Sequence, residues 1–185
     1  MAEEKRYRDM TPKEKLHEWL LTLLYLAIGA ALALIISNVF IQKVTVEGSS
    51  MVETLEEGDA LFGVRKIVLY RDVKRFDIVV IDMGDEGLFV KRVIGLPGET
   101  IQIEDQTIYI NGQVLDESYG SSLMRSPGIA KDPITLGENE YFVLGDNRAN
   151  SRDSRDPSVG IISEKQIQSK LGLRIFPFRK FGIVK

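Results

Sequence analysis

A polar and charged segment, residues 1–18, precedes 23 residues without a charge, from Trp19 to Ile41. An apolar run of this length spans a bilayer as an α-helix, because about 20 residues cross the hydrocarbon core. The alternatives are a buried helix of a soluble domain and a cleaved secretion signal. The run is too long for a cleaved signal, and the segment after it lacks a small-x-small cleavage site followed by a neutral stretch. We therefore predict a transmembrane helix over residues 19–41.

Short β-branched stretches separated by turn residues indicate that the remainder is β structure. Strands are predicted at 77–81, 88–94, 100–103, 107–110 and 171–176. The pair Asn111-Gly112 favours a type I′ hairpin turn. A short helix is predicted over 163–170, and residues 116–139 are expected to form an irregular insertion. The expected fold class is a mainly β domain of antiparallel sheets, partly barrel-like, over residues 42–185, with a single N-terminal transmembrane helix.

The basic residues beside the apolar run predict its orientation. Within the next 20 residues after the run only Lys43 is basic, whereas five basic residues precede it: Lys5, Arg6, Arg8, Lys13 and Lys15. Cytoplasmic flanks carry the excess of Lys and Arg. We therefore expect residues 1–18 in the cytoplasm and the β-rich domain on the extracytoplasmic side of the cell membrane, with membrane lipid as one partner.

Composition narrows the chemistry that the chain can perform. The net charge is −3, so there is no electrostatic reason to expect nucleic-acid binding. Cysteine is absent and His17 is the single histidine, located in the segment before the apolar run. Thiolate and histidine catalysis are thereby excluded from the β-rich region, together with His-rich metal sites. We expect neither a metal nor a cofactor.

Three segments carry residue types that could perform catalysis, and each also has an ordinary structural interpretation. Residues 48–55 (GSSMVETL) could be a turn that leads into a strand. Residues 89–98 (FVKRVIGLPG) place Lys91 and Arg92 in an apolar strand, where one of the two must be buried unless the strand lies at a sheet edge. Residues 145–155 (GDNRANSRDSR) could be a solvated loop.

Together, and in this order, the three segments resemble the type I signal peptidase family. They are similar to its Ser-Met-x-Pro-Thr-Leu, Tyr-Val-Lys-Arg-Val-x-Gly-x-Pro-Gly-Asp and Gly-Asp-Asn-Arg-x-x-Ser-x-Asp-Ser-Arg boxes. The resemblance covers essentially the whole chain and is strongest to Gram-positive-type members. It implies a membrane-bound serine endopeptidase that removes signal peptides from exported preproteins by cleavage after small residues, in an Ala-x-Ala pattern.

The resemblance also implies roles for individual residues. Ser50 would be the nucleophile, with its backbone N–H as an oxyanion donor, and Lys91 the general base. Ser151 would orient the lysine by a hydrogen bond, and Asp153 and Arg155 would form a supporting ion pair. The residues implied to line pockets for small substrate side chains are Met51, Leu55, Phe89 and Val90.

A lysine can serve as the base only if its pKa falls. Its ordinary pKa is about 10.4, so it is normally charged. Burial among apolar side chains penalises the ammonium form and lowers the pKa by up to several units. The apolar neighbours Phe89, Val90 and Val93 are surroundings of this kind. The placement of Lys91 in an apolar strand is therefore what a Ser-Lys protease requires.

The sequence departs from the family pattern at several positions. Glu53 stands where the first box has Pro, and Phe76 stands where the family has Gly in an Arg-Gly-Asp stretch. Two alternatives therefore stay open: a non-catalytic, membrane-tethered domain that binds exported segments, and a Ser-Lys protease for a specialised secreted substrate. The aromatic and basic stretch 176–181 is either a membrane-interface contact or a last strand with a basic tail.

Overall fold

The structure is a computed structural model that describes residues 10–65, 73–120 and 122–184. The chain divides into two compact units, with the boundary between Phe40 and Ile41. The basic residues Lys5, Arg6 and Arg8, which contributed to the predicted orientation, lie outside the described residues.

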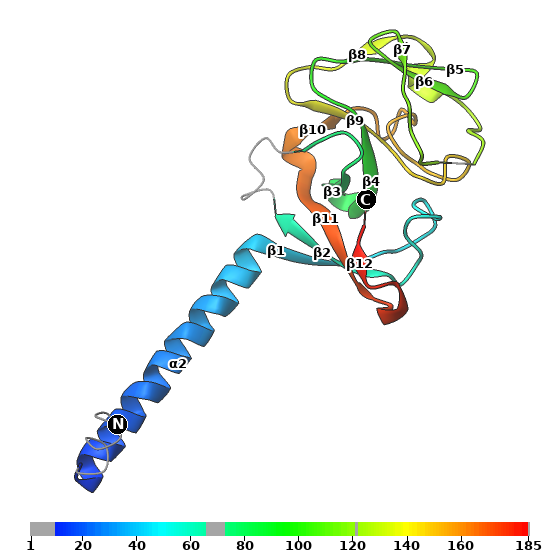
Figure 1. The fold of residues 1–185 in the computed structure, drawn as a ribbon. Coiled ribbons are helices and arrows are strands. Elements are labelled where there is room, and N and C mark those ends of the chain that lie inside the picture. The colour runs from blue at the N-terminus through cyan, green and yellow to red at the C-terminus, as the bar shows by residue number, and fades with distance from the viewer. Residues whose placement is uncertain (1–9, 66–72, 121, 185) are drawn as a thin grey trace. The chain divides into compact units, whose positions relative to one another are not determined.

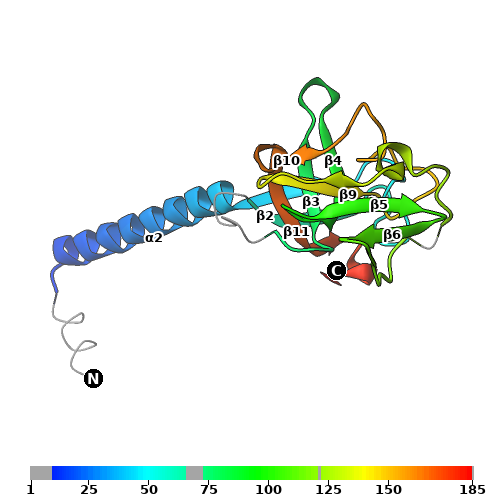
Figure 2. The same cartoon turned by 90° about the horizontal axis from the view of Figure 1, so that it is seen from above.

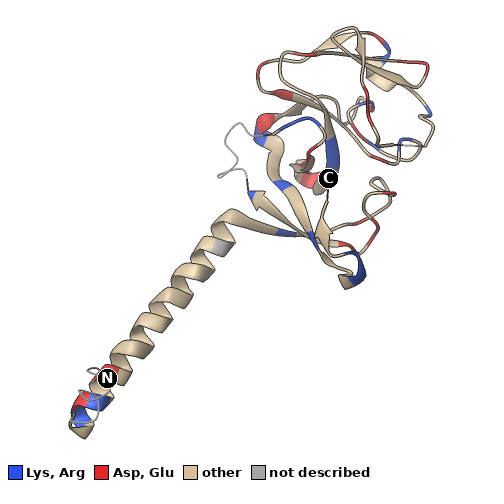
Figure 3. Ribbon diagram, viewed as in Figure 1, with Lys and Arg blue, Asp and Glu red and all other residues tan. Residues whose placement is uncertain are grey.

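The first unit contains helix α2 (Pro12–Phe40), whose 29 residues are long and apolar enough to cross a membrane. Thr11 caps its N-terminus: the Thr11 N–H donates to Glu14 Oε2 at 2.7 Å, and Thr11 Oγ1 accepts from the Glu14 N–H at 3.4 Å. This reciprocal pair is a capping box, and proline is favoured at the position that follows it. The helix therefore begins before the apolar run, and in Figure 3 its charged residues lie in the first turns only.

The second unit is built on an eight-stranded antiparallel sheet (Figure 1). Seven strands follow the order β1-β2-β11-β3-β4-β9-β10, and β12 pairs with β11. Their bounds are β1 (Ile41–Thr45), β2 (Ala60–Arg65), β3 (Ile78–Asp82), β4 (Leu88–Gly95), β9 (Glu140–Leu144), β10 (Ile162–Ser163), β11 (Ile167–Phe176) and β12 (Gly182–Ile183).

A smaller antiparallel sheet has the order β7-β6-β5-β8 and lies beside β9 (Figure 2). Its strands are β7 (Gln113–Val114), β6 (Thr107–Ile110), β5 (Thr100–Glu104) and β8 (Ile134–Thr135). Isoleucines of β5 and β6 pack against Ile94, Phe142 and Leu144 of the larger sheet in one buried cluster. The mainly β, antiparallel fold class is thus as predicted, and the described residues of the segment 116–139 contribute only β8 and the 3-10 helix η2 (Gly128–Lys131).

Two hairpin turns in the smaller sheet show how local sequence sets the chain direction. Asn111 and Gly112 have φ values of 53° and 76°, the left-handed pair that a type I′ turn requires. The β5–β6 hairpin turns at Asp105 and Gln106, with φ values of 44° and 73°.

The prediction of a helix over 163–170 is wrong. Only Glu164–Gln166 form a 3-10 turn, η3, which is capped by Ser163, and β11 then begins at Ile167. Ile167, Ser169 and Leu171 are buried in alternation with less buried residues. This period of two is the pattern of a strand, and it overrides the weak helical preference of the polar residues between them.

Strand β4 holds the second segment in the centre of the larger sheet, between β3 and β9. The edge-strand interpretation is therefore wrong. Lys91 and Arg92 are both buried, with exposed fractions of 5% and 0%. Each buried cation must then be compensated by a partner or by a lowered pKa. The remaining connections relevant to the site are the 3-10 helices η1 (Gly84–Glu86), between β3 and β4, and η4 (Phe178–Lys180).

Candidate active site

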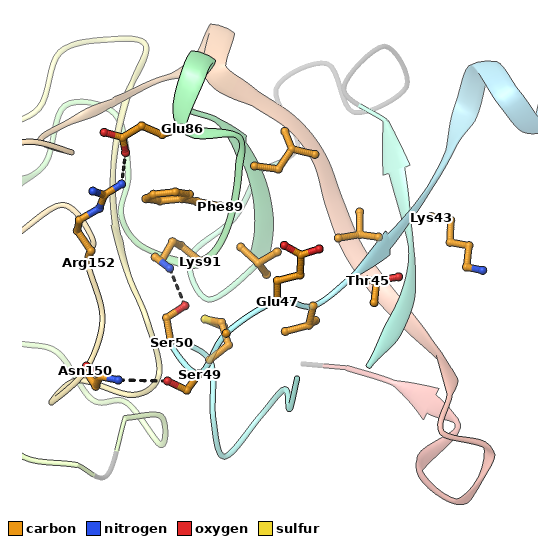
Figure 4. A pocket seen from close by; sticks show the side chains of 16 residues that line it. Lys43, Thr45, Glu47, Ser49, Ser50, Glu86, Phe89, Lys91, Asn150 and Arg152 are labelled. Atoms are coloured by element: carbon orange, nitrogen blue, oxygen red, sulfur yellow. Dashed lines mark hydrogen bonds and ion pairs between the residues drawn. The ribbon is translucent and has the colours of Figure 1, made fainter. Parts of the chain in front are cut away.

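Ser50 and Lys91 meet although 41 positions separate them in the sequence, with Lys91 Nζ 2.7 Å from Ser50 Oγ (Figure 4). Ser50 lies in a tight turn between β1 and β2, where the Val52 N–H donates to Ser49 O and the Leu55 N–H donates to Met51 O. The side chain of Met51 is buried in the core of the larger sheet. The turn is therefore anchored, and it presents the hydroxyl to β4.

Burial lowers the pKa of Lys91 from 10.5 to about 8. Loss of solvation is the largest cause, and the nearby cation of Arg152 lowers the pKa further, whereas the carboxylates of Asp153 and Asp146 raise it. A pKa of about 8 leaves a useful fraction of the amine neutral near neutral pH. The neutral amine at this distance can accept the Ser50 proton, which makes the pair a candidate nucleophile and base.

The loop of the third segment holds the Ser50 turn from the other side. The Asn147 N–H donates to Ser50 O at 3.0 Å, and Asn147 Nδ2 donates to Ser49 O at 3.1 Å. Asn150 Nδ2 donates to Ser49 Oγ at 3.1 Å. Because these bonds fix the backbone at both serines, the direction of the Ser50 side chain depends on this loop.

Gly145 begins that loop at a point where no side chain fits. A Cβ added to Gly145 would lie 2.5 Å from Ser50 O and still closer to Ser151 Oγ. We expect Gly145→Ala to lower the free energy of unfolding by about 1–3 kcal/mol, because the loop must move away from the Ser50 turn. Urea denaturation of the purified full chain measures the change. Gly172→Ala is the matched control, since a Cβ there meets nothing within 4 Å; an equal loss in both variants would contradict the prediction.

Asp153 and Arg155 form the ion pair that the resemblance implies, in a bidentate arrangement. Arg155 Nε lies 2.8 Å from Asp153 Oδ1, and Arg155 Nη2 lies 2.8 Å from Asp153 Oδ2. Asp153 Oδ2 also accepts the Gly145 N–H at 3.0 Å, and Arg155 Nη1 donates to Arg148 O at 3.0 Å. The pair thus fastens both ends of the loop that contacts Ser50.

Ser151 does not make the hydrogen bond to Lys91 that we expected. Its Oγ is buried and has no partner among the residues that the structure describes. The hydroxyl is instead directed at Gly145, whose missing side chain leaves room for it. A buried hydroxyl without a partner is energetically costly.

A groove of about 680 Å³ passes over the Ser50–Lys91 pair. Three of the four predicted pocket residues line it: Met51, Phe89 and Val90. Leu55 does not line it, because its side chain is fully buried in the core cluster that also contains Met51. The prediction that Leu55 lines the groove is therefore wrong. Leu55 belongs to the buried cluster that contains Met51, and Met51 does line the groove.

Sequence reasoning missed the partner of Arg92. Its guanidinium pairs with Asp146 of the third segment through Nε–Oδ1 at 2.8 Å and Nη2–Oδ2 at 2.6 Å, and both residues are buried. Thr54 Oγ1 donates to Asp146 Oδ2 at 2.6 Å, which ties the end of the Ser50 turn to the pair. The ring of Tyr119 lies 3.5 Å from the guanidinium carbon. One indication of a separate partner was present in the sequence: on an alternating strand, Arg92 faces the side opposite to Lys91.

A second missed feature lies at the rim of the groove. Arg152 forms an ion pair with Glu86 of η1, and its guanidinium lies 5.0 Å from the centroid of the Phe89 ring. Lys91 Nζ lies 5.2 Å from the same centroid. The cation of Arg152 is thus held near the base, in agreement with its effect on the pKa of Lys91. Within the described part of the chain, no three His, Cys, Asp or Glu side chains are grouped to hold a metal ion.

Comparison with known proteins gives matches over most of the chain. The family model described as "Signal peptidase, peptidase S26" matches residues 16–176. Signal peptidase I of Bacillus licheniformis is 37% identical, over 97% of each chain, and Signal peptidase I T of Bacillus subtilis is 37% identical, over 100% of each. A solved signal peptidase I of Enterococcus faecalis is 34% identical, with a TM-score of 0.45, and the match covers 54% of this chain and 96% of that one.

Proposed function

Because the chain belongs to the signal peptidase family, peptidase S26, we propose that it removes signal peptides with Ser50 as the nucleophile and Lys91 as the general base. The chain is a serine endopeptidase by its family. The observation that carries the assignment of residues is the 2.7 Å contact between Ser50 Oγ and Lys91 Nζ, in a site where burial lowers the lysine pKa. The burial of Lys91 beside the hydroxyl of Ser50 is what a Ser-Lys mechanism needs.

The neutral amine of Lys91 takes the hydroxyl proton as Ser50 Oγ attacks the carbonyl carbon of the cleaved bond. The oxyanion that forms is stabilised by the backbone N–H of Ser50. The ammonium of Lys91 then gives its proton to the leaving amine, and an acyl ester remains on Ser50. A water that loses its proton to Lys91 attacks this ester, and the proton returns to Ser50 Oγ as the acid product leaves.

The activity should follow the neutral fraction of Lys91. Below the pKa, kcat/KM is expected to rise about tenfold per pH unit, and above about pH 8 it should level off. The sign follows from the role of the base, because only the deprotonated amine can accept the proton. Initial rates between pH 6 and pH 10, with a peptide that has no group titrating in this range, measure the profile.

A matched variant sharpens the pH experiment. Arg152→Gln removes a cation that lowers the pKa of Lys91, so the rise in its profile should move to higher pH. A profile that is flat from pH 6 to pH 10 in the unsubstituted enzyme would contradict Lys91 as the base.

Ser151 is proposed as a positioning residue, and Asp153 with Arg155 as the support of its loop. The Ser151 hydroxyl, which is buried and has no partner in the described part of the chain, would gain a hydrogen bond by turning to Lys91. The ion pair of Asp153 and Arg155 holds the loop in place while this occurs. Met51, Phe89 and Val90 would bound shallow apolar pockets for the small residues that precede the cleaved bond in an Ala-x-Ala pattern.

The signal peptidase I family is membrane-anchored, and α2 is the described helix that is able to span a membrane. We propose that residues before α2 lie in the cytoplasm and the β domain lies outside, as the excess of basic residues before the apolar run indicates. Because the chain has no cysteine, single-cysteine variants report each side cleanly. A membrane-impermeant maleimide on intact cells should label Lys131→Cys and leave Met10→Cys unlabelled until the cells are lysed. The reverse pattern would contradict the orientation.

A further inference from the structure

A second cavity, of about 480 Å³, adjoins the groove. Asn150 and Arg152 line both, so the two spaces share a border. Figure 4 shows Ser50 and Lys91 between Glu47 on one side and Arg152 with Asn150 on the other. The candidate nucleophile therefore lies in the groove, and the second cavity adjoins the groove on the side of Asn150 and Arg152.

Four arginines line the second cavity, and two of them form ion pairs within the protein. Arg148 gives both terminal nitrogens to Glu117, each at 2.7 Å, and Arg155 is paired with Asp153. Both arginines are buried, with exposed fractions of 2% and 7%. The carboxylates of Glu117 and Asp153 hold these two side chains in place and compensate their charges.

The other two arginines are accessible. Arg125 is exposed and has no ion pair or hydrogen bond among the described residues. Arg152 is held by the ion pair with Glu86 and by the Phe89 ring, and the side chains of the ion pair are 45% and 46% exposed. An exposed pair of this kind contributes little, about 0–1 kcal/mol, so a competing carboxylate can exchange with Glu86. Among the described residues that line this cavity, Asp156 is the acidic one, and its carboxylate accepts the Ser158 N–H.

The direction of the substrate follows from the proposed function, on which this inference rests. If the residues before the cleaved bond lie against Met51, Phe89 and Val90, the bond itself lies at Ser50. The second cavity adjoins the groove at Asn150 and Arg152, so it is a space next to Ser50 into which the chain after the bond can continue. An extended peptide advances about 3.3 Å per residue, so the first few residues of the released protein reach the second cavity.

We propose that the second cavity binds the first residues of the released chain, and that Arg125 and Arg152 select an acidic side chain among them. A guanidinium matches a carboxylate in a bidentate, charge-assisted arrangement, and the amide of Gln cannot replace that charge. A phosphate-bearing lipid headgroup has related chemistry, but the shared border with the Ser50 groove favours the peptide.

The test uses the full chain in a neutral detergent and peptides that carry Glu, Gln or Lys at the first, second or third position after the cleaved bond. At one of these positions kcat/KM for Glu should exceed that for Gln by about fivefold, and Lys should be the poorest. The preference should shrink as salt is added, because exposed charges are screened.

Matched variants assign the preference to the cavity. Arg125→Gln should reduce the Glu-to-Gln ratio, and the double variant Arg125→Gln/Arg152→Gln should bring it to about one. Asp156→Asn removes the competing carboxylate, so it should increase the ratio. Arg179→Gln, an exposed arginine that does not line either space, should leave the ratio unchanged.

The outcomes separate this inference from the proposed function. Cleavage of all peptides with equal kcat/KM at all three positions would overturn the acidic subsite and leave the Ser50–Lys91 mechanism intact. Cleavage by Ser50→Ala would instead overturn the mechanism. If Arg125→Gln slows cleavage only in vesicles of anionic lipid, and equally for the Glu and Gln peptides, the cavity binds lipid and the proposal is wrong.

Discussion

Ser50→Ala should lower cleavage of a preprotein by at least about 10⁴-fold, because no acyl ester can form without the hydroxyl. The effect is on kcat, since the substitution removes one oxygen and leaves the walls of the groove in place. Single-turnover cleavage by the purified full chain in detergent measures it. Ser158→Ala is a suitable control, because Ser158 is exposed and lies outside the groove.

The folded state of the Ser50→Ala variant should be unchanged. The anchors of the turn are the buried side chain of Met51 and the bond from the Asn147 N–H to Ser50 O, and neither uses the hydroxyl. Urea denaturation should therefore still give one cooperative transition, with a stability lowered only by the lost Lys91–Ser50 hydrogen bond, about 0.5–1.5 kcal/mol. Retention of more than about a tenth of the activity in a folded variant would contradict Ser50 as the nucleophile and would favour catalysis by other residues.

Lys91→Met should lower cleavage by at least about 10³-fold, because methionine fills similar space and cannot accept a proton. Lys91→Arg is the informative companion. It keeps the positive charge, but a guanidinium is not deprotonated in proteins, so it should be as inactive as the methionine variant. Activity in Lys91→Arg would show that the site needs a cation there and not a base.

Lys91→Met should also stabilise the fold. The pKa of Lys91 is about 8 in the folded state and near 10.5 in the unfolded chain, so the folded state disfavours the charged amine. The resulting cost is fully present below pH 8 and disappears as the pH rises through 10.5. Lys91→Met should thus raise the free energy of unfolding by up to about 3 kcal/mol at pH 7, and by much less at pH 11. Urea denaturation at the two pH values tests the sign.

The features that sequence predicted well are those with a local physical cause. Asn111-Gly112 adopts the left-handed turn because few other residue pairs accept it. The meeting of Ser50 with Lys91 was expected only because three segments resembled a family pattern; no periodicity relates two positions so far apart. The sequence allowed Lys91 to be buried or to lie on an edge strand, and the pairing of β4 with both β3 and β9 shows that it is buried.

The features that sequence missed depend on long-range packing. Nothing near Arg92 in the sequence identifies Asp146 as its partner, and removal of either residue from so buried a pair would cost about 3–5 kcal/mol. Leu55 lies close to the turn in sequence, yet the core cluster draws it away from the groove. Ser151 fills the space above Gly145. In each case the final position is set by contacts with another segment.

Two departures from the family pattern have a backbone explanation. Phe76 has φ of 71°, in the left-handed region where glycine, the family residue at this position, is favoured. Its ring lies 5.3 Å from that of Tyr119, so aromatic packing offsets part of the strain. Glu53 has φ of 92°, which a proline, fixed near −65°, cannot adopt. The turn that follows Ser50 therefore differs in shape from one that contains the family proline.

The most direct test of the central claim is to identify the residue that carries the acyl group. An activated ester of a peptide ending in Ala-x-Ala, incubated with the full chain in detergent, should acylate one residue that mass spectrometry of the digested protein can locate. We expect the acyl group on Ser50, no labelling of Ser50→Ala, and much slower labelling of Lys91→Met. Labelling of another residue, or equal rates in the unsubstituted and Lys91→Met proteins, would contradict the Ser50–Lys91 mechanism.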